Sequence, residues 1–255
     1  MFGATLFIAL VGFADDIRPI PVLPRLVLQA AAVGSVLMAL PDDLRIFPAS
    51  PLPFERGFLL VAGLWFVNLV NFMDGLDLMT AAEIIPITCA LTLLGWLGEF
   101  PAWPTIVAAA LGGAMLGFSP FNRPVAKVFL GDVGSLPIGL LLGWCLLQLA
   151  FQHQLVAALL LPLYYLADAT VTLLRRISRR EPFWAAHRSH FYQQATENGL
   201  TVPRVVGEVF LLNAVLALLA FVSILAKPAW SLASLLAGIV GVTLVLYRFS
   251  RKRSL

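Results

Sequence analysis

Four short polar clusters interrupt an otherwise apolar chain, and they hold the side chains that could do chemistry. They are the pair 15–16, the run 68–77, the turn 131–135 and the run 187–190. Carboxylate oxygens are the ligands that Mg²⁺ prefers in proteins, and imidazoles donate to phosphate oxygens or transfer protons near neutral pH. These residue types point to metal-assisted handling of a phosphate group.

The third cluster centres on Asp132 in the glycine-rich stretch 127–139. We expect a loop here, because glycine lets the backbone approach a ligand closely, followed by an apolar helix from about Leu136. A carboxylate at such a helix start suits a divalent metal, and the free N–H groups suit a phosphate. The alternative is a helix cap made by Asp132 or Ser135. Lys127 is either a phosphate contact or a marker of topology.

Carboxylates also dominate the first two clusters. Asp15 and Asp16 are adjacent and repel each other unless a cation such as Mg²⁺ or Arg18 lies nearby; the alternative is a solvated helix end. The second cluster places a polar residue at every third position: Asn68, Asn71, Asp74 and Asp77. Residues three apart share a helix face, and a break near Gly75 would let the two aspartates enter one pocket. Such residues at the end of an apolar helix are functional by default.

The fourth cluster follows the arginine-rich run 175–180. His187 and His190 would contact phosphate oxygens or transfer a proton, and their spacing also suits a metal pair. With only two imidazoles there and carboxylates elsewhere, Mg²⁺ held by oxygen is favoured over zinc. The arginine run fits a topology signal better than a catalytic role. Asp168, further upstream, either pairs with Arg175 or has a functional role.

The composition indicates a membrane protein. Charged residues make up 12% of the 255 and hydrophobic residues 60%, so the charge is about half that of a typical soluble domain. Cys89 and Cys145 both lie in apolar runs, so neither a disulfide framework nor a zinc site is indicated. We expect an all-α, polytopic membrane helix bundle with about nine transmembrane helices in a single domain, 1–255. The apolar segments are 2–14, 22–40, 57–73, 80–98, 103–119, 134–152, 155–174, 205–226 and 229–247.

The positive residues separate between the two sides that these helices would define. Fourteen of the 17 Lys and Arg residues fall on one side, and Arg45, Arg56 and Lys227 fall on the other. The positive-inside rule makes the first side, with the C-terminus, cytoplasmic. All four polar clusters lie on that side. A basic, carboxylate-rich site there indicates phosphoryl transfer between a soluble nucleotide and an acceptor held in the lipid bilayer.

In their order along the chain, the four motifs resemble the polyprenyl-phosphate N-acetylhexosamine-1-phosphate transferases of the glycosyltransferase 4 superfamily. The matching residues are Gly12-Phe-Ala-Asp15-Asp16, Asn68-Leu-Val-Asn71-Phe-Met-Asp74-Gly75-Leu-Asp77, Phe129-Leu-Gly131-Asp132-Val-Gly134-Ser135 and His187-Arg-Ser-His190. One motif alone is weak, whereas four in family order across the whole chain are specific. Residues 71–74 and the stretch ending at Tyr192 look closest to the bacterial branch that initiates O-antigen and other cell-envelope glycans.

The resemblance implies a reaction and a location. The phosphate of undecaprenyl phosphate would attack the β-phosphorus of a UDP-N-acetyl sugar and release UMP, with Mg²⁺, or alternatively Mn²⁺, as cofactor. The product would begin a lipid-linked glycan for the cell wall or for lipopolysaccharide. The enzyme would lie in the inner membrane of a bacterium with its active face cytoplasmic. Nucleic acid is not expected as a partner, and a homodimer is compatible with the family.

The resemblance also assigns roles to residues. Asp132 and Asp16 would bind the metal, and Asp15 would lie beside the lipid phosphate. One of the two adjacent aspartates is proposed as a base in the family, but a phosphate monoester is already ionised at neutral pH, so positioning is the favoured role for both. His187 and His190 would contact the pyrophosphate with support from Arg188. The nucleotide pocket would hold Asn68, Asn71, Asp74, Gly75 and Asp77.

Three features depart from the family pattern. Leu78 follows Asp77 where the family usually has glycine, which would alter the nucleotide loop. A third clustered histidine, present in some members, is absent. The family has two further N-terminal helices before its Asp-Asp motif, and the chain as written lacks them. Either the start codon is assigned too late or the form is truncated, and the chain as written would then fold incompletely and be inactive.

Functions from other classes compete with this interpretation. A transporter or channel would use the acids as a substrate pathway, but its polar residues would lie near the middle of the bilayer and not at one face. A truncated, inactive homologue with a scaffold role is a second alternative. A CDP-alcohol phosphotransferase is a third, and its paired Asp-Gly…Asp-x-x-x-Asp pattern is absent from the sequence.

Overall fold

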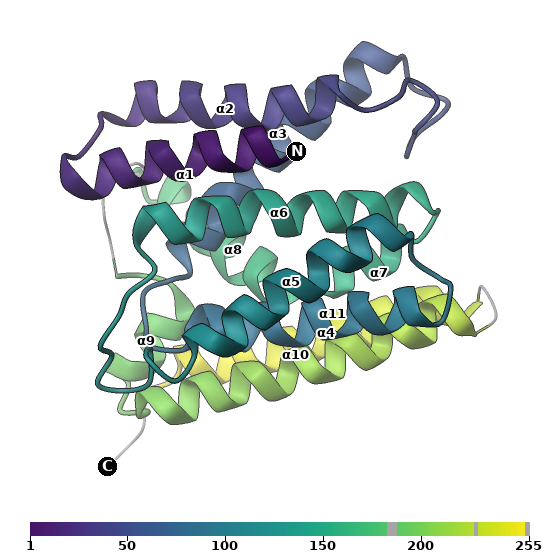
Figure 1. Cartoon of the computed structure of the whole chain (residues 1–255). Coiled ribbons are helices and arrows are strands. Elements are labelled where there is room, and N and C mark those ends of the chain that lie inside the picture. Colours follow the sequence, from purple (N-terminus) through teal and green to yellow (C-terminus); the bar gives the residue numbers. More distant parts are fainter. Residues whose placement is uncertain (183–187, 227–228, 253–255) are drawn as a thin grey trace. The chain divides into compact units, whose positions relative to one another are not determined.

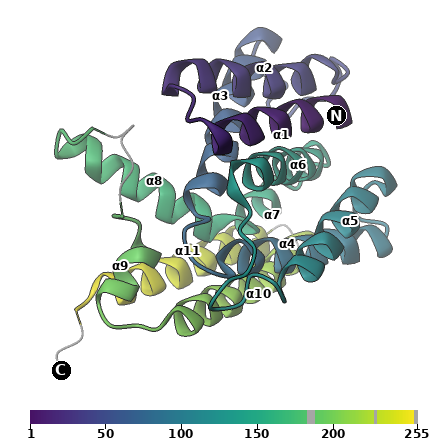
Figure 2. The same cartoon turned by 60° about the vertical axis from the view of Figure 1, so that its left-hand side comes forward.

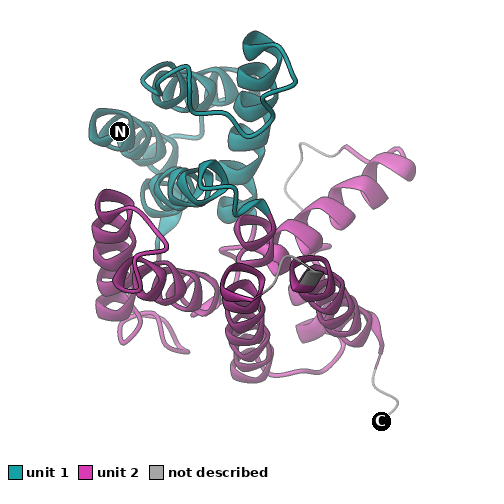
Figure 3. Cartoon of the chain, turned by 90° about the vertical axis from the view of Figure 1, so that its right-hand side faces the viewer, with its two compact units in different colours: residues 1–72, 130–155 teal, residues 73–129, 156–255 magenta. Residues whose placement is uncertain are grey.

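The computed structural model describes residues 1–182, 188–226 and 229–252, and every regular element within these ranges is an α-helix. The all-α prediction is confirmed. The chain divides into two compact units, coloured separately in Figure 3: residues 1–72 with 130–155, and residues 73–129 with 156–255. The division falls inside the 68–77 motif, between Phe72 and Met73. The prediction of a single domain over 1–255 stays a prediction.

The first unit contains α1 (Phe2–Ile17), α2 (Val22–Met38), α3 (Leu52–Phe72) and α6 (Gly131–Phe151). α1 packs against α2 and α6, and α3 packs against the same two helices (Figure 1). Their shared core is formed by aliphatic side chains including Ile8, Val33, Val67 and Leu136. α1 stops just before Pro19, which has no N–H to continue a helix, and the short turn returns the chain as α2.

Gly12 permits the close contact between α1 and the start of α6. A Cβ atom built at Gly12 would collide with the backbone of Asp132 and Val133. Only a residue without a side chain allows two helix backbones to approach so closely. The last turn of α1, which carries Asp15 and Asp16, is therefore held beside the first turn of α6.

The second unit contains α4 (Met79–Trp96), α5 (Ala102–Phe118), α8 (Leu163–Ser178), α9 (Phe191–Glu197), α10 (Val202–Leu225) and α11 (Ala229–Ser250). α4 packs against α5 and α10, and α10 also packs against α11, which lies alongside it in both Figure 1 and Figure 2. A buried polar pair joins α4 to α10, since Asn213 Nδ2–H donates to Glu83 Oε2 at 2.6 Å. The short α9 packs against α8, α10 and α11.

Several helices are long and apolar enough to cross a membrane. Among the described residues these are α3, α4, α6, α10 and residues 230–250 of α11, with α2 and α5 as shorter apolar helices. Large apolar side chains also remain exposed on their outer faces, such as Phe58, Val61, Leu218 and Leu244. Exposed apolar surface of this extent suits contact with lipid and not with water. The prediction of a polytopic membrane helix bundle is confirmed.

One expected segment is divided in the structure. The sequence predicted a single helix over 155–174, but α7 (Leu155–Leu160) ends before Pro162 and α8 continues to Ser178. Proline lacks an N–H and its ring clashes with the preceding turn, so it ends the first helix and leads into the second. α8 therefore begins later, and its polar residues belong to a separate element.

The connection between α3 and α4 is held by side chains at both ends. Leu78 adopts the left-handed conformation, with φ at +66°, and its N–H donates to Asn122 Oδ1 at 2.6 Å. Asn122 Nδ2–H in turn donates to the carbonyl of Val128 at 2.8 Å. Asp77 Oδ2 accepts the Ala126 N–H at 3.1 Å. The departure from the glycine expected after Asp77 is therefore accommodated by strain at Leu78 and support from the 119–129 loop.

We predict that Gly12→Ala lowers the stability of the protein, whereas Gly3→Ala does not. The added methyl group at position 12 meets the Asp132 backbone and should cost about 1–3 kcal/mol, while position 3 on the same helix has open space. Alanine at position 3 should stabilise the helix by up to about 1 kcal/mol. Thermal unfolding of the purified variants in detergent measures both changes. Equal midpoints for the two variants would contradict the close α1–α6 contact.

We predict that Leu78→Gly is tolerated better than Leu78→Val. Glycine relieves a left-handed strain of about 1–2 kcal/mol, whereas a β-branched residue increases it. Leu76→Gly is the matched control, since Leu76 is outside the residues with positive φ and gains no such relief. The measurement is again the unfolding midpoint. The prediction fails if glycine is no better at position 78 than at position 76.

Candidate active site

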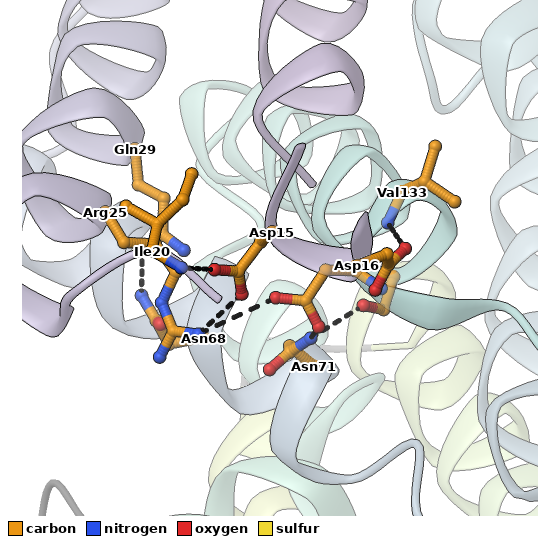
Figure 4. A network of polar contacts seen from close by, with 10 residues as sticks. Asp15, Asp16, Ile20, Arg25, Gln29, Asn68, Asn71 and Val133 are labelled. Carbon is orange, nitrogen blue, oxygen red and sulfur yellow. Dashed lines mark hydrogen bonds and ion pairs between the residues drawn. The ribbon is translucent and has the colours of Figure 1, made fainter. Parts of the chain in front are cut away.

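In the first unit, Arg25 joins Asp15 to Asp132, and its contact with Asp15 is seen in Figure 4. Asp15, in the last turn of α1, accepts the Ile20 N–H at 2.5 Å and the Arg25 Nη1–H at 2.9 Å. The same Nη1 lies 3.8 Å from Asp132 Oδ2. One guanidinium from α2 thus lies between acids from α1 and α6. Arg18, one of the two cations considered for neutralising the aspartate pair, is exposed in the turn after α1, and the ion-pair partner of Asp15 is Arg25.

The contacts of Asp15 keep it ionised. Burial by itself would raise the pKa of the Asp15 carboxyl, but the hydrogen bonds from Ile20 and Arg25 outweigh that effect, and the pKa lies below its ordinary value. The side chain is only 10% exposed, so salt screens its ion pair with Arg25 less than a surface pair. A carboxylate in this state is a weak general base and a strong electrostatic partner.

Asp132 lies in the first turn of α6, and not in the glycine-lined loop that the sequence predicted. Asn71, near the end of α3, donates Nδ2–H to Asp132 Oδ1 at 2.7 Å and to Ser135 Oγ at 2.9 Å. Asp132 and Ser135 both lie inside α6, whose N-cap residue is Leu130, so the cap role considered for either of them is excluded.

The second oxygen of Asp132 is the distinctive atom of this group. Oδ2 is buried, and none of the described residues donates a hydrogen bond to it. Arg25 is close, but 3.8 Å is too long for a hydrogen bond. A buried carboxylate oxygen without a donor is costly unless a cation or a solvent molecule satisfies it. A hard cation would do so, with Asp15 as its neighbour.

Asp16 binds the beginning of α6. Its Oδ1 accepts the Asp132 N–H at 2.9 Å, and its Oδ2 accepts the Val133 N–H at 3.0 Å. These are N–H groups that a helix leaves unpaired in its first turn, and a negative charge there is stabilised by the helix dipole. Gly131, with φ at +59°, leaves the space that this carboxylate fills. Asp16 therefore orients Asp132, and its predicted metal role stays a prediction.

Asn68 is buried between α2 and α3. Its Nδ2–H donates to Gln29 Oε1 at 2.7 Å and to the carbonyl of Leu64 at 2.8 Å (Figure 4). Gln29 lies one helical turn after Arg25 on the same helix, so the amide pair fixes the face of α2 that presents the guanidinium. The structure gives Asn68 this supporting contact, and its predicted contact with substrate stays a prediction.

The second unit holds the remaining aspartates of the 68–77 motif. The helix break predicted near Gly75 is confirmed, since α3 ends at Phe72 and α4 begins at Met79. Asp74 accepts a hydrogen bond from the Thr80 hydroxyl, whereas Asp77 binds the Ala126 N–H. The two carboxylates thus have separate partners.

His190 lies at the start of α9 and is only 4% exposed. Its Nδ1 is 3.3 Å from Asp168 Oδ1. Asp168 thus contacts the histidine loop, and the alternative in which it pairs with Arg175 is wrong, because the Arg175 guanidinium lies 4.5 Å over the Phe191 ring. Arg188 is exposed in the same loop. His187 lies outside the described residues.

The predicted site residues form two groups, one in each unit. Asp15, Asp16, Asn68, Asn71 and Asp132 belong to the first, and Asp74, Gly75, Asp77, Arg188 and His190 belong to the second. Among the described residues, no three His, Cys, Asp or Glu side chains are grouped as ligands of one metal.

Sequence reasoning missed Arg25, Gln29 and Tyr192 as parts of these groups. Arg25 was assigned only to the topology count, although an arginine in the first turn after a proline-rich turn faces the acids that precede it. Gln29 follows it by one helical turn, a spacing that places both on one face. Tyr192 is buried against Gly75, where its hydroxyl occupies the space of a missing Cβ. Only the tertiary contact reveals that role.

A family model described as glycosyl transferase family 4 matches residues 1–150. The phospho-N-acetylmuramoyl-pentapeptide-transferase of Gluconacetobacter diazotrophicus is 31% identical over 256 aligned positions, covering 84% of this chain and 68% of that protein. The protein of the same name from a Wolbachia of Drosophila simulans is 34% identical over 158 positions, covering 54% of this chain and 48% of that protein. The chain is therefore a multi-pass membrane protein that belongs to glycosyl transferase family 4.

Proposed function

We propose that this chain transfers a sugar-1-phosphate of the N-acetylhexosamine type from a UDP-sugar to undecaprenyl phosphate. A phosphate oxygen of the lipid attacks the β-phosphorus of the UDP-sugar, and the bond from that phosphorus to the bridging oxygen breaks. The electron pair of that bond leaves with UMP, and the lipid carries a diphosphate-linked sugar. The names of the two relatives support transfer of a phospho-sugar.

The buried Oδ2 of Asp132, without a hydrogen-bond donor among the described residues, is the observation that carries this proposal. The Arg25 guanidinium, which forms an ion pair with Asp15, lies close to this oxygen. A phosphoryl transfer site needs a place where cations and the negative charge of a diphosphate meet. In this proposal that place is the first turn of α6, where Asp132 Oδ2 has no donor among the described residues and Asn71 and Arg25 lie beside it.

The donor set fits Mg²⁺, with Mn²⁺ as an alternative. Mg²⁺ in such enzymes is commonly held by one or two carboxylates, with substrate phosphates and water completing the octahedron. Asp132 would hold it, with Asp15 as the neighbouring carboxylate, and Asp16 acts mainly by orienting the α6 backbone. When bound, the ion would neutralise the diphosphate and polarise the bond to be broken.

The remaining residues of this group act by holding geometry. Asn71 fixes Asp132 Oδ1, so that only Oδ2 is available to a ligand. Arg25 keeps Asp15 ionised and in place. A phosphate monoester is already largely ionised at neutral pH, so the attack needs no protein base. The contact of His187, His190 and Arg188 with the diphosphate of the donor, which the family resemblance implies, stays a prediction.

The setting follows from the same proposal. The positive-inside distribution supports a cytoplasmic site, and the membrane in this proposal is a bacterial inner membrane, whose cytoplasmic face meets UDP-sugars. Undecaprenyl phosphate reaches it from the bilayer. The lipid-linked product would begin a cell-envelope glycan of the O-antigen or cell-wall type.

Asp132→Asn is predicted to reduce transfer by about 100-fold or more, because the amide cannot replace the charge of a metal-binding oxygen while it can still accept from Asn71. UMP release from UDP-sugar in membranes containing undecaprenyl phosphate measures this loss. Membrane insertion should be unchanged, as shown by the amount of protein in the membrane fraction.

The matched control is Asp42→Asn, which removes an exposed carboxylate in the loop between α2 and α3. Its transfer rate should equal that of the unmodified chain. Near-normal turnover in Asp132→Asn, at equal membrane content, would refute the role of Asp132.

The donor is tested with a panel of UDP-N-acetylhexosamines and UDP-N-acetylmuramoyl-pentapeptide. We expect one or more of the simple hexosamine donors to give a lipid-linked product, identified by mass spectrometry, with one UMP released per product. Product from the pentapeptide donor alone would overturn the hexosamine assignment. No UMP release from any donor would overturn the proposed function.

A further inference from the structure

Asp168 is a fully buried acid outside the motifs that the family resemblance uses. It lies on α8 with 0% exposure, and hydroxyl groups donate to it from Tyr164 at 3.2 Å and Thr172 at 3.3 Å. The backbone N–H groups of Phe191 and Tyr192 donate to it at 2.9 Å and 3.1 Å. Such a carboxylate is held in one position by donors on both sides.

Asp168 fixes the start of α9 from a different helix. Phe191 and Tyr192 are the first residues of α9, and their N–H groups lack partners within the helix itself. The Arg175 guanidinium, one turn or more further along α8, lies over the Phe191 ring at 4.5 Å. α8 therefore holds α9 by a carboxylate at its backbone and by a cation at its first side chain.

The same carboxylate orients His190. An ionised carboxylate only accepts hydrogen bonds, so the 3.3 Å contact is attractive when Nδ1 of His190 carries the proton. With the proton on Nδ1, this contact fixes the direction of the imidazole ring. The His190 ring is also stacked on the Tyr192 ring, with centroids 5.8 Å apart and planes inclined by 24°.

Tyr192 connects His190 to the Asp74–Gly75 loop. Its side chain is fully buried, and its hydroxyl occupies the space where a Cβ of Gly75 would lie. The Gly75 backbone hydrogen-bonds to that hydroxyl, and burial raises the pKa of Tyr192, so the phenol stays neutral. Gln193 lies against the same glycine. Asp168, His190, Tyr192 and Gly75 therefore form one connected path within the second unit.

We propose that Asp168 is a positioning residue for the donor nucleotide-sugar: it fixes His190 and Tyr192 against the Asp74–Gly75 loop. This inference rests on the proposed function, because His190 and that loop are the groups expected to contact the donor. Asp168 itself touches no substrate in this scheme. Substitution of Asp168 should therefore change the KM for the donor and not the KM for the lipid acceptor. This change should depend on the presence of His190.

The test compares Asp168→Asn, His190→Ala and the double variant in the transfer assay. An amide presents an NH₂ group to the donors of α9, so the KM for the UDP-sugar should rise by about 10-fold or more, as for other groups that orient a ligating histidine. The KM for undecaprenyl phosphate should change by less than about 2-fold, because a substitution at an independent site has little effect on the binding of the other substrate. The double variant should be no worse than His190→Ala alone.

Glu83→Gln is the matched control. It also converts a buried acid of the second unit to an amide, but glutamine can still accept the hydrogen bond from Asn213, and Glu83 is outside the path to His190. Its donor KM should be unchanged. Binding of UDP alone, measured by calorimetry on the same purified proteins, reports the donor site without turnover and should weaken only in the Asp168 and His190 variants.

Several outcomes would overturn the inference. They are an unchanged donor KM in Asp168→Asn, equal rises in the two substrate KM values, or losses that simply add in the double variant. If Asp168→Asn does not accumulate, Thr172→Val removes one of the donors to the carboxylate with less disturbance, and it must raise the donor KM while leaving the acceptor KM unchanged. Absence of transfer by the unmodified chain would count against the proposed function, and normal UDP binding by Asp168→Asn would then count separately against its positioning role.

Discussion

The structure depends on how acids are stabilised within a bundle of apolar helices. A carboxylate removed from water needs cations or several hydrogen-bond donors around it. Asp15 meets this need with Arg25, and Glu55 meets it with Arg45 at 2.6 Å. Asp168 meets it with backbone N–H groups at the start of another helix, and the exposed Asp16 makes the same kind of contact. Each solution fixes a side chain and, with it, the helices that supply its partners.

The two backbone contacts follow the same physical logic in separate units. The first N–H groups of a helix have no acceptors within it and carry part of the positive end of its dipole. Asp16 satisfies them for α6, 116 residues further along the chain, and Asp168 satisfies them for α9. In one unit the predicted site residue Asp132 carries one of the bound N–H groups, and in the other the predicted site residue His190 directly precedes them. Acids that resemble catalytic groups can therefore act by placing their neighbours.

Asp132 differs from Asp15 and Asp16 because one of its buried oxygens has no donor in the part of the chain that the structure describes; Glu83 of the second unit also has such an oxygen. Two of its neighbours are engaged, since Asn71 binds Oδ1 and Arg25 Nη1 donates to Asp15. The unpaired oxygen is costly within the protein alone, and functional sites are where such costs are retained. The proposed metal-assisted transfer gives that oxygen a partner.

Much of the fold and part of the site could be predicted from residue types and spacing. Apolar segments predicted the helices well, since length and hydropathy are local properties, but the segment at 155–174 failed where Pro162 divides it. The spacing of Asn68, Asn71 and Asp74 predicted a helix end and a break near Gly75. It could not predict that Asp74 and Asp77 have separate partners, because Thr80 and Ala126 are selected by loop geometry.

The sequence by itself determined the class of protein, the membrane setting and which acids, amides and imidazoles are candidates, because composition and motif order are written in the chain. Tertiary structure decided which acid does what. In the structure Asp16 binds the first N–H groups of α6, and Asp132 has an oxygen without a donor among the described residues. Asp168 contacts His190 and not Arg175. The reason is that hydrogen bonding depends on distance and direction between residues far apart in sequence, and neither is encoded in local spacing.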